Sequence, residues 1–311
     1  MGQMTQCADD KPLAAAQRDL VHREEPQVRR SAMQVCRTVA ECRDVLAVYR
    51  QASETIGLVP TMGFLHEGHM ALVSEAKSRA DRVVTTIFVN PTQFGEAADL
   101  DAYPRDEARD LAMLEAAGVD VVLIPEVADV YPEGDETIVE TTRMANMLHG
   151  KVRPGHFRGV TTVVARLFNF TQPDIACFGE KDYQQLQVIK RMTRDLAFPI
   201  EIVGVPIVRE ADGLAMSSRN VRLSPEDRVA ALILSQSLDA AERVKSSDPD
   251  TLRETISQTI ATEPRATLRG LDIVEAETLN DIQSGYAGPI AIMLSVEFGG
   301  VLLLDQRVIT L

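Results

Sequence analysis

The sequence predicts an α/β protein with a Rossmann-like, doubly wound parallel sheet and a smaller C-terminal α+β domain. Short apolar or β-branched runs alternate with helical segments of ten or more residues between positions 39 and 208, which is typical of βαβ units. The β-branched run at 83–89 has the composition of a strand covered on both faces. After residue 208 the alternation stops, and apolar runs on either side of Phe298-Gly299-Gly300 indicate a hairpin.

The expected elements of the first part begin with a helix at 39–50, whose apolar residues recur at three- and four-residue steps. A strand at 56–60 is stopped by its proline. A helix at 106–117 closes at Gly118, a residue suited to a left-handed C-cap. The remaining expected elements are helices at 69–79, 159–170 and 183–196 and strands at 83–89, 119–124, 175–178 and 201–208.

The second part begins with a helix at 225–244, entered through Ser224-Pro225, an N-cap followed by proline at the first helical position. A loop at 246–249 and strands at 271–275 and 290–296 follow. The expected organisation is a poorly ordered N-terminal extension at 1–32, a Rossmann-like domain at 33–207 and a C-terminal domain at 208–311.

Composition excludes several functional classes. The 311 residues carry a net charge of −14, which repels a polyphosphate backbone and argues against nucleic-acid binding. Four irregularly spaced cysteines are too few for a disulfide framework in a chain of this length. No apolar run approaches the ~18 residues of a membrane span, and the polar, acid-containing first thirty residues match no targeting peptide. We therefore expect a soluble cytoplasmic protein.

The residues that carry chemistry begin in the loop from Pro60 to His69, between the first sheet strand and its helix. Gly63 and Gly68 have the spacing of a P-loop, but His69 stands where that motif has lysine. The glycines let the backbone approach a ligand closely, and the helix start favours anionic phosphate. Because the positive end of the helix dipole disfavours imidazolium, we expect neutral rings at His66 and His69 that donate hydrogen bonds to phosphoryl oxygens. A tight turn with one surface and one buried histidine is the structural alternative, and the lack of a third ligand in the segment disfavours zinc.

This loop resembles the HIGH motif of nucleotidylyl transferases, and the stretch Gly57–His69 is similar to that of the pantothenate synthetase (pantoate–β-alanine ligase) family. Four further blocks agree with that family, in its order, so that the resemblance covers the chain from about residue 33 to the C-terminus. They are Phe88–Phe94, Arg153–Val160, Phe178–Leu186 and Asp212–Asn220. The last block also resembles the KMSKS loop of aminoacyl-tRNA synthetases, a mobile cover over triphosphate.

The resemblance implies a two-step reaction. ATP and (R)-pantoate give pantoyl-adenylate and pyrophosphate with Mg²⁺, and β-alanine then attacks the mixed anhydride to release AMP and pantothenate. By the same resemblance His66, His69 and Lys181 are catalytic, the Rossmann-like domain binds ATP and pantoate, the C-terminal domain is a lid, and the protein is a homodimer.

The resemblance also assigns ligands to individual positions. Contacts with ATP fall on Pro60, Thr61, Met62, Gly63, Phe64, Leu65, His66, Glu67, Gly68, His69, Gly179, Glu180, Lys181, Asp182, Val208, Met216, Ser217, Ser218 and Arg219. Contacts with pantoate and β-alanine fall on Asn90, Gln93 and Gln185, and the triphosphate region is lined by Arg153, His156 and Arg158. Asp110 is a candidate metal ligand, but Arg109 interrupts the acidic run, so phosphate oxygens are expected to hold most of the Mg²⁺ coordination.

Each block also has an interpretation without a ligand. Asn90 fits a turn at Asn-Pro, and residues 179–182 fit a capped helix start. Residues 216–219 fit a polar loop between domains. Arg153 and His156 fit a surface of salt bridges. Two rival functions stay open as well. A nucleotidylyltransferase that attaches AMP to a phosphorylated precursor would need no amine, and a non-catalytic regulator would bind ATP without turnover.

Overall fold

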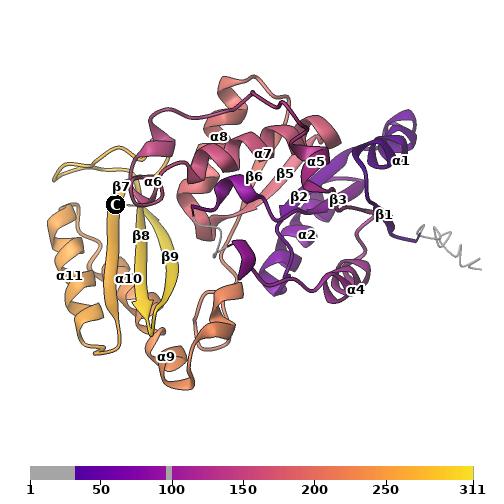
Figure 1. Cartoon of the computed structure of the whole chain (residues 1–311). Coiled ribbons are helices and arrows are strands. Elements are labelled where there is room, and N and C mark those ends of the chain that lie inside the picture. The colour runs from indigo at the N-terminus through magenta and orange to yellow at the C-terminus, as the bar shows by residue number, and fades with distance from the viewer. Residues whose placement is uncertain (1–31, 96–99, 311) are drawn as a thin grey trace, which may run out of the picture. The chain divides into compact units, whose positions relative to one another are not determined.

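The computed structural model describes residues 32–95 and 100–310, and the described residues from Met33 onward belong to one compact unit (Figure 1). The expected extension at 1–32 therefore lies, except for Ala32, outside the described residues. None of the described helices has the length and hydrophobicity needed to cross a bilayer.

A parallel six-stranded sheet confirms the predicted fold class. Its spatial order is β1-β4-β3-β2-β5-β6, and every neighbouring pair is parallel. The strands are β1 (Gln34–Cys36), β2 (Ile56–Thr61), β3 (Arg82–Ile87), β4 (Val121–Leu123), β5 (Ile175–Gly179) and β6 (Glu201–Val205). The chain progresses outward from β2 to β3 and β4, then crosses back to β5 beside β2. The carboxyl ends of β2 and β5 therefore form the topological switch point, where ligands of such sheets bind.

Helices cover both faces of this sheet. Its helices are α1 (Val39–Gln51), α2 (Glu67–Arg79), α4 (Glu107–Ala117), α5 (Val127–Val130), α6 (His149–Val152), α7 (His156–Thr171) and α8 (Tyr183–Asp195). Alternate strand residues point to opposite faces, so Leu58 packs with α1, α7 and α8 while Val59 packs with α2 and α4. The doubly wound arrangement follows from this division.

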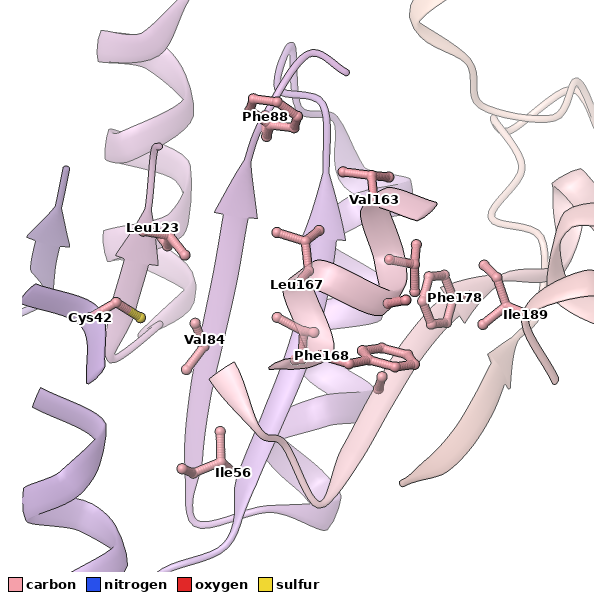
Figure 2. Close-up of a cluster of buried hydrophobic side chains, with 14 of the residues drawn as sticks. Cys42, Ile56, Val84, Phe88, Leu123, Val163, Leu167, Phe168, Phe178 and Ile189 are labelled. Atoms are coloured by element: carbon pink, nitrogen blue, oxygen red, sulfur yellow. The ribbon is translucent and has the colours of Figure 1, made fainter. Parts of the chain in front are cut away.

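Phe168 of α7 lies at the centre of the core between the sheet and α1, α7 and α8 (Figure 2). Its ring is 1% exposed and meets Phe178 of β5 and Phe198 edge-on, with centroids 6.5 and 5.5 Å away. Edge-to-face packing of this kind adds about 0.5–1.5 kcal/mol per pair beyond burial. This core anchors β5 and thus the loop that leaves it.

The C-terminal part forms a second, antiparallel sheet in the order β7-β8-β9 (Figure 1). Its elements are α9 (Pro225–Ala230), α10 (Ile233–Val244), α11 (Pro249–Ala261), β7 (Thr267–Glu275), β8 (Pro289–Phe298) and β9 (Val301–Thr310). The predicted hairpin is present, and φ is +55° at Gly299 and +82° at Gly300. Two positive φ angles in succession suit a two-residue hairpin turn and favour glycine at both places.

Several predicted boundaries were wrong for physical reasons. The strand predicted at 201–208 ends at Val205, because Pro206 has no N–H to donate to a neighbouring strand. The helix predicted over 225–244 is interrupted between Ala230 and Ile233 and forms α9 and α10. Residue 249, predicted to be in a loop, is the first residue of α11, with Asp248 as its N-cap. The predicted C-cap at Gly118 is present, with φ of +72°.

Candidate active site

The loop between β2 and α2 is held in shape by one carboxylate. Phe64 N and Leu65 N donate hydrogen bonds to Asp110 Oδ2 and Oδ1, each at 2.7 Å, and Asp110 is only 1% exposed. Gly63 and Phe64 both have positive φ, +79° and +52°. A Cβ at Gly63 would also lie 3.0 Å from Asp110 Oδ2, so glycine is needed there for conformation and for space. Asp110, the candidate metal ligand, thus has both oxygens bound to the loop backbone.

The two histidines of the loop share a network with the helix start. His66 is the N-cap of α2, and its Nδ1 accepts from Gly68 N at 3.1 Å. His66 N in turn donates to Nδ1 of His69 at 3.2 Å, and the two ring centroids are 4.2 Å apart. Because Nδ1 accepts a backbone N–H in both rings, each neutral ring carries its proton on Nε2. Both Nε2–H groups remain as donors for a ligand.

Desolvation keeps both rings neutral. Partial burial lowers the pKa of His66 to about 4, with the charge of Lys181 acting in the same direction. Burial, His66 and Lys181 lower the pKa of His69 to about 3. The neutral state is the one we expected from the helix dipole, but withdrawal from water is its largest cause.

A pocket of about 790 Å³ opens beside these rings, within the range of about 300–1,000 Å³ that ligand pockets occupy. It brings together most of the positions assigned from the resemblance: Pro60, Thr61, Met62, His66, Gly68, His69, Asn90, Gln93, Arg153, His156, Gly179, Glu180, Lys181, Asp182, Gln185, Val208, Met216, Ser217, Ser218 and Arg219. Those that do not line it are Gly63, Phe64, Leu65, Glu67 and Asp110. Leu65 is fully buried in the core under α2 and Asp110 bonds the loop backbone, whereas Glu67 is exposed.

Asn90 and Gln93 have different environments. Asn90 is 1% exposed and caps the short helix η1 (Pro91–Gln93). Its Nδ2 donates to Gly159 O and to Gln93 Oε1, both at 3.2 Å, and its Oδ1 accepts from Tyr131 Oη at 2.8 Å. Asn90 therefore both fixes the Asn-Pro turn and orients Gln93, whose Nε2 lies 3.1 Å from Met62 Sδ. Gln93 is the better placed of the two to meet a ligand.

The turn after β5 presents Lys181 and Asp182 to the pocket from η3 (Glu180–Asp182). The carboxylate of Asp182 makes no capping hydrogen bond to α8, so the alternative of a capped helix start does not describe it. Asp182 Oδ2 lies 3.9 Å from Lys181 Nζ. The charge of Lys181 is the main reason that the pKa of Asp182 is lowered. An ammonium therefore faces the same space as the two imidazoles.

The Met216–Arg219 loop leads into η4 (Ser218–Arg222). Ser217 caps this helix by accepting from Arg219 N at 3.2 Å. A Cβ at Gly68 would lie 3.9 Å from Cβ of Met216, so this loop reaches the start of α2. Residues Met216 to Arg219 line the pocket. A simple connecting loop gives no reason for an arginine at position 219, whereas a place in the pocket lining does.

Arg153, the C-cap of α6, and His156, the first residue of α7, also line the pocket. The backbone oxygen of Gln93 lies 2.9 Å from His156 Nδ1. Burial, followed by the charge of Arg153, lowers the pKa of His156 to about 4. Arg158 of the same sequence block is exposed and does not line the pocket.

Two kinds of lining residue were not predicted from the sequence. His149 and Tyr103 have no motif signal of their own, and Asp272, Met293 and Ser295 come from the C-terminal sheet. Residues of β7 and β8 join this wall only through tertiary packing. Four of the five histidines of the sequence line this one pocket. Such a gathering of histidines is not visible when each sequence motif is considered separately. Within the described residues, no group of three or more His, Cys, Asp or Glu is arranged to hold a metal.

Known proteins are similar to this chain over most of its length. The sequence model for pantoate-beta-alanine ligase matches residues 34–308. Pantothenate synthetase of Agrobacterium fabrum is 51% identical over 280 residues, which are 89% of this chain and 96% of that protein. Pantothenate synthetase of Brucella anthropi is 50% identical, over 89% and 97% of the two chains.

Solved structures are similar as well. A pantothenate synthetase from Thermus thermophilus superposes with a TM-score of 0.83 at 46% identity, over 88% of this chain and 99% of that one. Pantoate-beta-alanine ligase from Francisella tularensis, complexed with beta-gamma ATP and beta-alanine, has a TM-score of 0.72 at 34% identity, over 89% and 97% of the chains. The chain belongs to the pantoate-beta-alanine ligase family.

Proposed function

We propose that this protein condenses (R)-pantoate with β-alanine, using ATP, through a pantoyl-adenylate and with release of AMP and pyrophosphate. One observation carries the proposal. Two neutral imidazoles and the Lys181 ammonium, from loops at the switch point of the sheet, line one pocket with Arg219. The family to which the chain belongs and the ligands named for the Francisella relative support the same reaction.

In the first step a pantoate carboxylate oxygen attacks the α-phosphorus of ATP, and the bond to the bridging oxygen of pyrophosphate breaks. Negative charge gathers on the α-phosphate and on the leaving group. The Nε2–H groups of His66 and His69 and the ammonium of Lys181 provide fixed donors for this charge. Neutral imidazoles suit this role because departing pyrophosphate needs charge compensation more than a proton.

Mg²⁺ fits this pocket as an ion bound mainly by the triphosphate. Within the described residues no cluster of three or more acidic, His or Cys side chains is available as a cage, and both oxygens of Asp110 accept loop amides. Mg²⁺ commonly keeps several waters and binds through substrate phosphates with one or two carboxylates. When bound, it would neutralise charge on the β- and γ-phosphates. Among the carboxylates that line the pocket, the exposed one of Asp182, beside Lys181, would be the protein group available to the ion.

In the second step the neutral amine of β-alanine attacks the acyl carbon, the bond from that carbon to the AMP oxygen breaks, and the nitrogen releases a proton to solvent. Gln93 and Gln185 line the pocket with uncharged amides that suit the hydroxyl and carboxylate groups of the acids. Asn90 acts as a positioning residue for Gln93. The Met216–Arg219 loop lies over the same pocket, and excluding water there protects the mixed anhydride from hydrolysis.

We also propose that residues 33–207 and 208–311 act as two domains, that the protein is a homodimer and that it acts in the cytoplasm. Separate sheets with separate apolar clusters support the division. The family resemblance supports the dimer. The buried free thiols of Cys36, Cys42 and Cys177 suit a reducing compartment. Analytical ultracentrifugation and cell fractionation test these statements.

AMP formation with each substrate omitted in turn tests the reaction. We expect AMP only when pantoate, β-alanine and ATP are all present, and ATP–pyrophosphate exchange when pantoate alone accompanies ATP. AMP transfer to a phosphorylated precursor without an amine would favour the rival nucleotidylyltransferase. Binding of ATP without turnover would favour a regulator.

His69→Ala and Lys181→Ala test the site. Each should lower pantoate-dependent exchange by about 10²–10³-fold, the loss typical when one fixed donor to a developing oxyanion is removed. Lys190→Ala, at an exposed lysine further along α8, is the matched control and should leave exchange unchanged. Near-wild-type exchange in both site variants would refute the assignment.

A further inference from the structure

His149 is a pocket histidine to which neither the family resemblance nor the proposed reaction gives a role. It is the first residue of α6 and lines the pocket together with Arg153, Asp182 and Arg219. Among the described residues its ring has no hydrogen-bond partner. Its place in the fold is nevertheless tightly determined.

Gln184 holds the segment that carries His149. The side chain of Gln184 is buried, with 4% exposure, and Oε1 accepts from His149 N at 3.0 Å. Its Nε2 donates to Met144 O at 2.9 Å and to Met147 O at 2.8 Å. These three bonds satisfy the buried amide and fix the turn of backbone before α6.

The backbone around His149 is also strained and closely packed. Leu148 has φ of +48° and ψ of −123°, a backbone conformation that residues other than glycine rarely adopt. A Cβ at Gly150 would lie 2.1 Å from Ala145 O, so the chain passes directly over that carbonyl. A strained backbone conformation persists only where surrounding contacts hold it in place, and strained residues are frequent at functional sites. The effect here is to direct one imidazole to the pocket.

The charges that act on this imidazole are those of the expected triphosphate region. Burial, followed by the charges of Arg153 and Arg219, lowers the pKa of His149, whereas Asp182 acts in the opposite direction. The charges of Arg153, His149 and Asp182 also act on the pKa of His156. A neutral imidazole among two guanidiniums offers a donor for a phosphate oxygen without adding to the repulsion between cations.

We propose that His149 is a binding residue of the triphosphate site, with its ring donating a hydrogen bond to the oxygens that leave as pyrophosphate. The proposal rests on the function proposed above and adds a residue to its leaving-group end. Dianionic phosphate next to the ring would also favour imidazolium, so binding of pyrophosphate is coupled to proton uptake by His149 from solvent. Arg153, Arg219, Asp182 and His156 are the titratable or charged groups that face it.

His149→Ala and His149→Gln test the proposal with inorganic pyrophosphate as the probe. We expect His149→Ala to weaken pyrophosphate binding and product inhibition, and to raise KM for ATP, by roughly ten-fold, with KM for pantoate and β-alanine unchanged. His149→Gln keeps a neutral N–H donor and should recover part of the loss. Because Gln184 bonds the backbone N of residue 149, both substitutions leave its hydrogen bonds in place. Lys151→Ala, in the same short helix but outside the pocket lining, is the control.

A second readout follows the ring directly. In NMR titrations of the wild-type protein, the imidazole signal that disappears in His149→Gln should shift on addition of pyrophosphate, and its titration midpoint should move to higher pH. An unshifted signal, together with pyrophosphate affinity within two-fold of wild type in His149→Ala, would overturn the proposal. If wild-type AMP formation proved independent of pantoate, the proposed function itself would fail. If that dependence held while both His149 results were negative, only the present inference would fail.

Discussion

Gly68 shows how one missing side chain shapes the candidate site. A Cβ at this position would lie 2.8 Å from Cε1 and 2.9 Å from Nδ1 of the His66 ring. The φ angle of Gly68 is not positive, so the requirement is for space rather than for conformation. From the sequence we expected this glycine to let the backbone approach a ligand closely. In the structure its missing side chain leaves room for the ring of His66. Because Gly68 has no side chain, the imidazole of His66 can pack against the start of α2.

Gly68→Ala should therefore displace the His66 ring and lower pantoate-dependent ATP–pyrophosphate exchange by about 10–100-fold, since a misplacement of about 1 Å can cost 10²-fold. Exchange kinetics and thermal unfolding are the measurements. Gly95→Ala is the matched control, because a Cβ there meets nothing within 4 Å. Equal activity of the two variants would contradict the geometry of the ring pair.

Asp110→Asn separates loop support from metal binding. An amide side chain accepts at only one atom and would turn its NH2 toward the second loop N–H, so one bond of the pair at 2.7 Å is lost. Hydrogen bonds to charged groups contribute about 1.5–3 kcal/mol, and we expect a ten- to hundred-fold lower exchange rate with the Mg²⁺ concentration at half-maximal rate unchanged. A large increase in that Mg²⁺ concentration would instead identify Asp110 as a metal ligand.

At the scale of elements, the Met216–Arg219 loop depends on the hairpin that precedes it. Arg209 and Ala215 form an isolated antiparallel bridge, and Met216 N donates to Val208 O at 2.9 Å. Arg209 also reaches β9, where its guanidinium binds Asp305 through two hydrogen bonds of 2.8 and 2.9 Å. The side chain of Asp305 is 0% exposed. An ion pair with a buried carboxylate thus ties the loop that faces the pocket to the C-terminal sheet.

Arg209→Ala leaves the carboxylate of Asp305 buried without its cation and should lower the free energy of unfolding by about 3–5 kcal/mol. Urea denaturation measures this change. The double variant Arg209→Met, Asp305→Leu removes both charges and should recover most of the loss. A double variant as unstable as Arg209→Ala would show that packing of the arginine stem, rather than an unpaired charge, decides stability here.

For the whole molecule, partly buried histidines make stability depend on pH. The folded pKa is about 4 for His66 and His156 and about 3 for His69, below the value of about 6.5 in an unfolded chain. Between these values the unfolded state binds more protons, so the free energy of unfolding falls as pH falls from about 6.5 to 4. The slope should be steepest near pH 5, where the rings are protonated in the unfolded chain and neutral in the folded protein.

Urea unfolding at pH 7.5, 6.5, 5.5 and 5.0 checks this expectation, with proton uptake on unfolding near pH 5.5 as the direct measurement. His69→Asn should reduce the uptake by about one proton. Stability that stays constant from pH 7 to 5 would mean that these rings have the same pKa in the folded protein as in the unfolded chain. The same pKa values predict that protonation of His66 and His69 gives no midpoint near pH 6.5 in the pH dependence of exchange activity.

The fold class was predictable because its signals are local, and most residues that line the candidate pocket were named from the ordered blocks of the family resemblance. Alternation of strands and helices follows from side-chain periodicity, and the left-handed cap at Gly118 follows from a single residue type. Strand β1 escaped prediction because three residues carry too little pattern, and its place in the sheet depends on pairing with β4. Helix α11 was also missed, although Leu252, Ile256 and Ile260 are buried at four-residue spacing behind the proline start that marks it.

The amino-acid order by itself determined the succession of elements, the ordered blocks that identify the family and the loops that carry His66, His69 and Lys181. Only the tertiary structure decided that Asp110 binds the loop 46 residues away and that Gln184 positions His149 across 35 residues. The physical reason is range: propensity and periodicity act between near neighbours in the chain, whereas a hydrogen bond between distant residues exists only once packing has brought the two partners together.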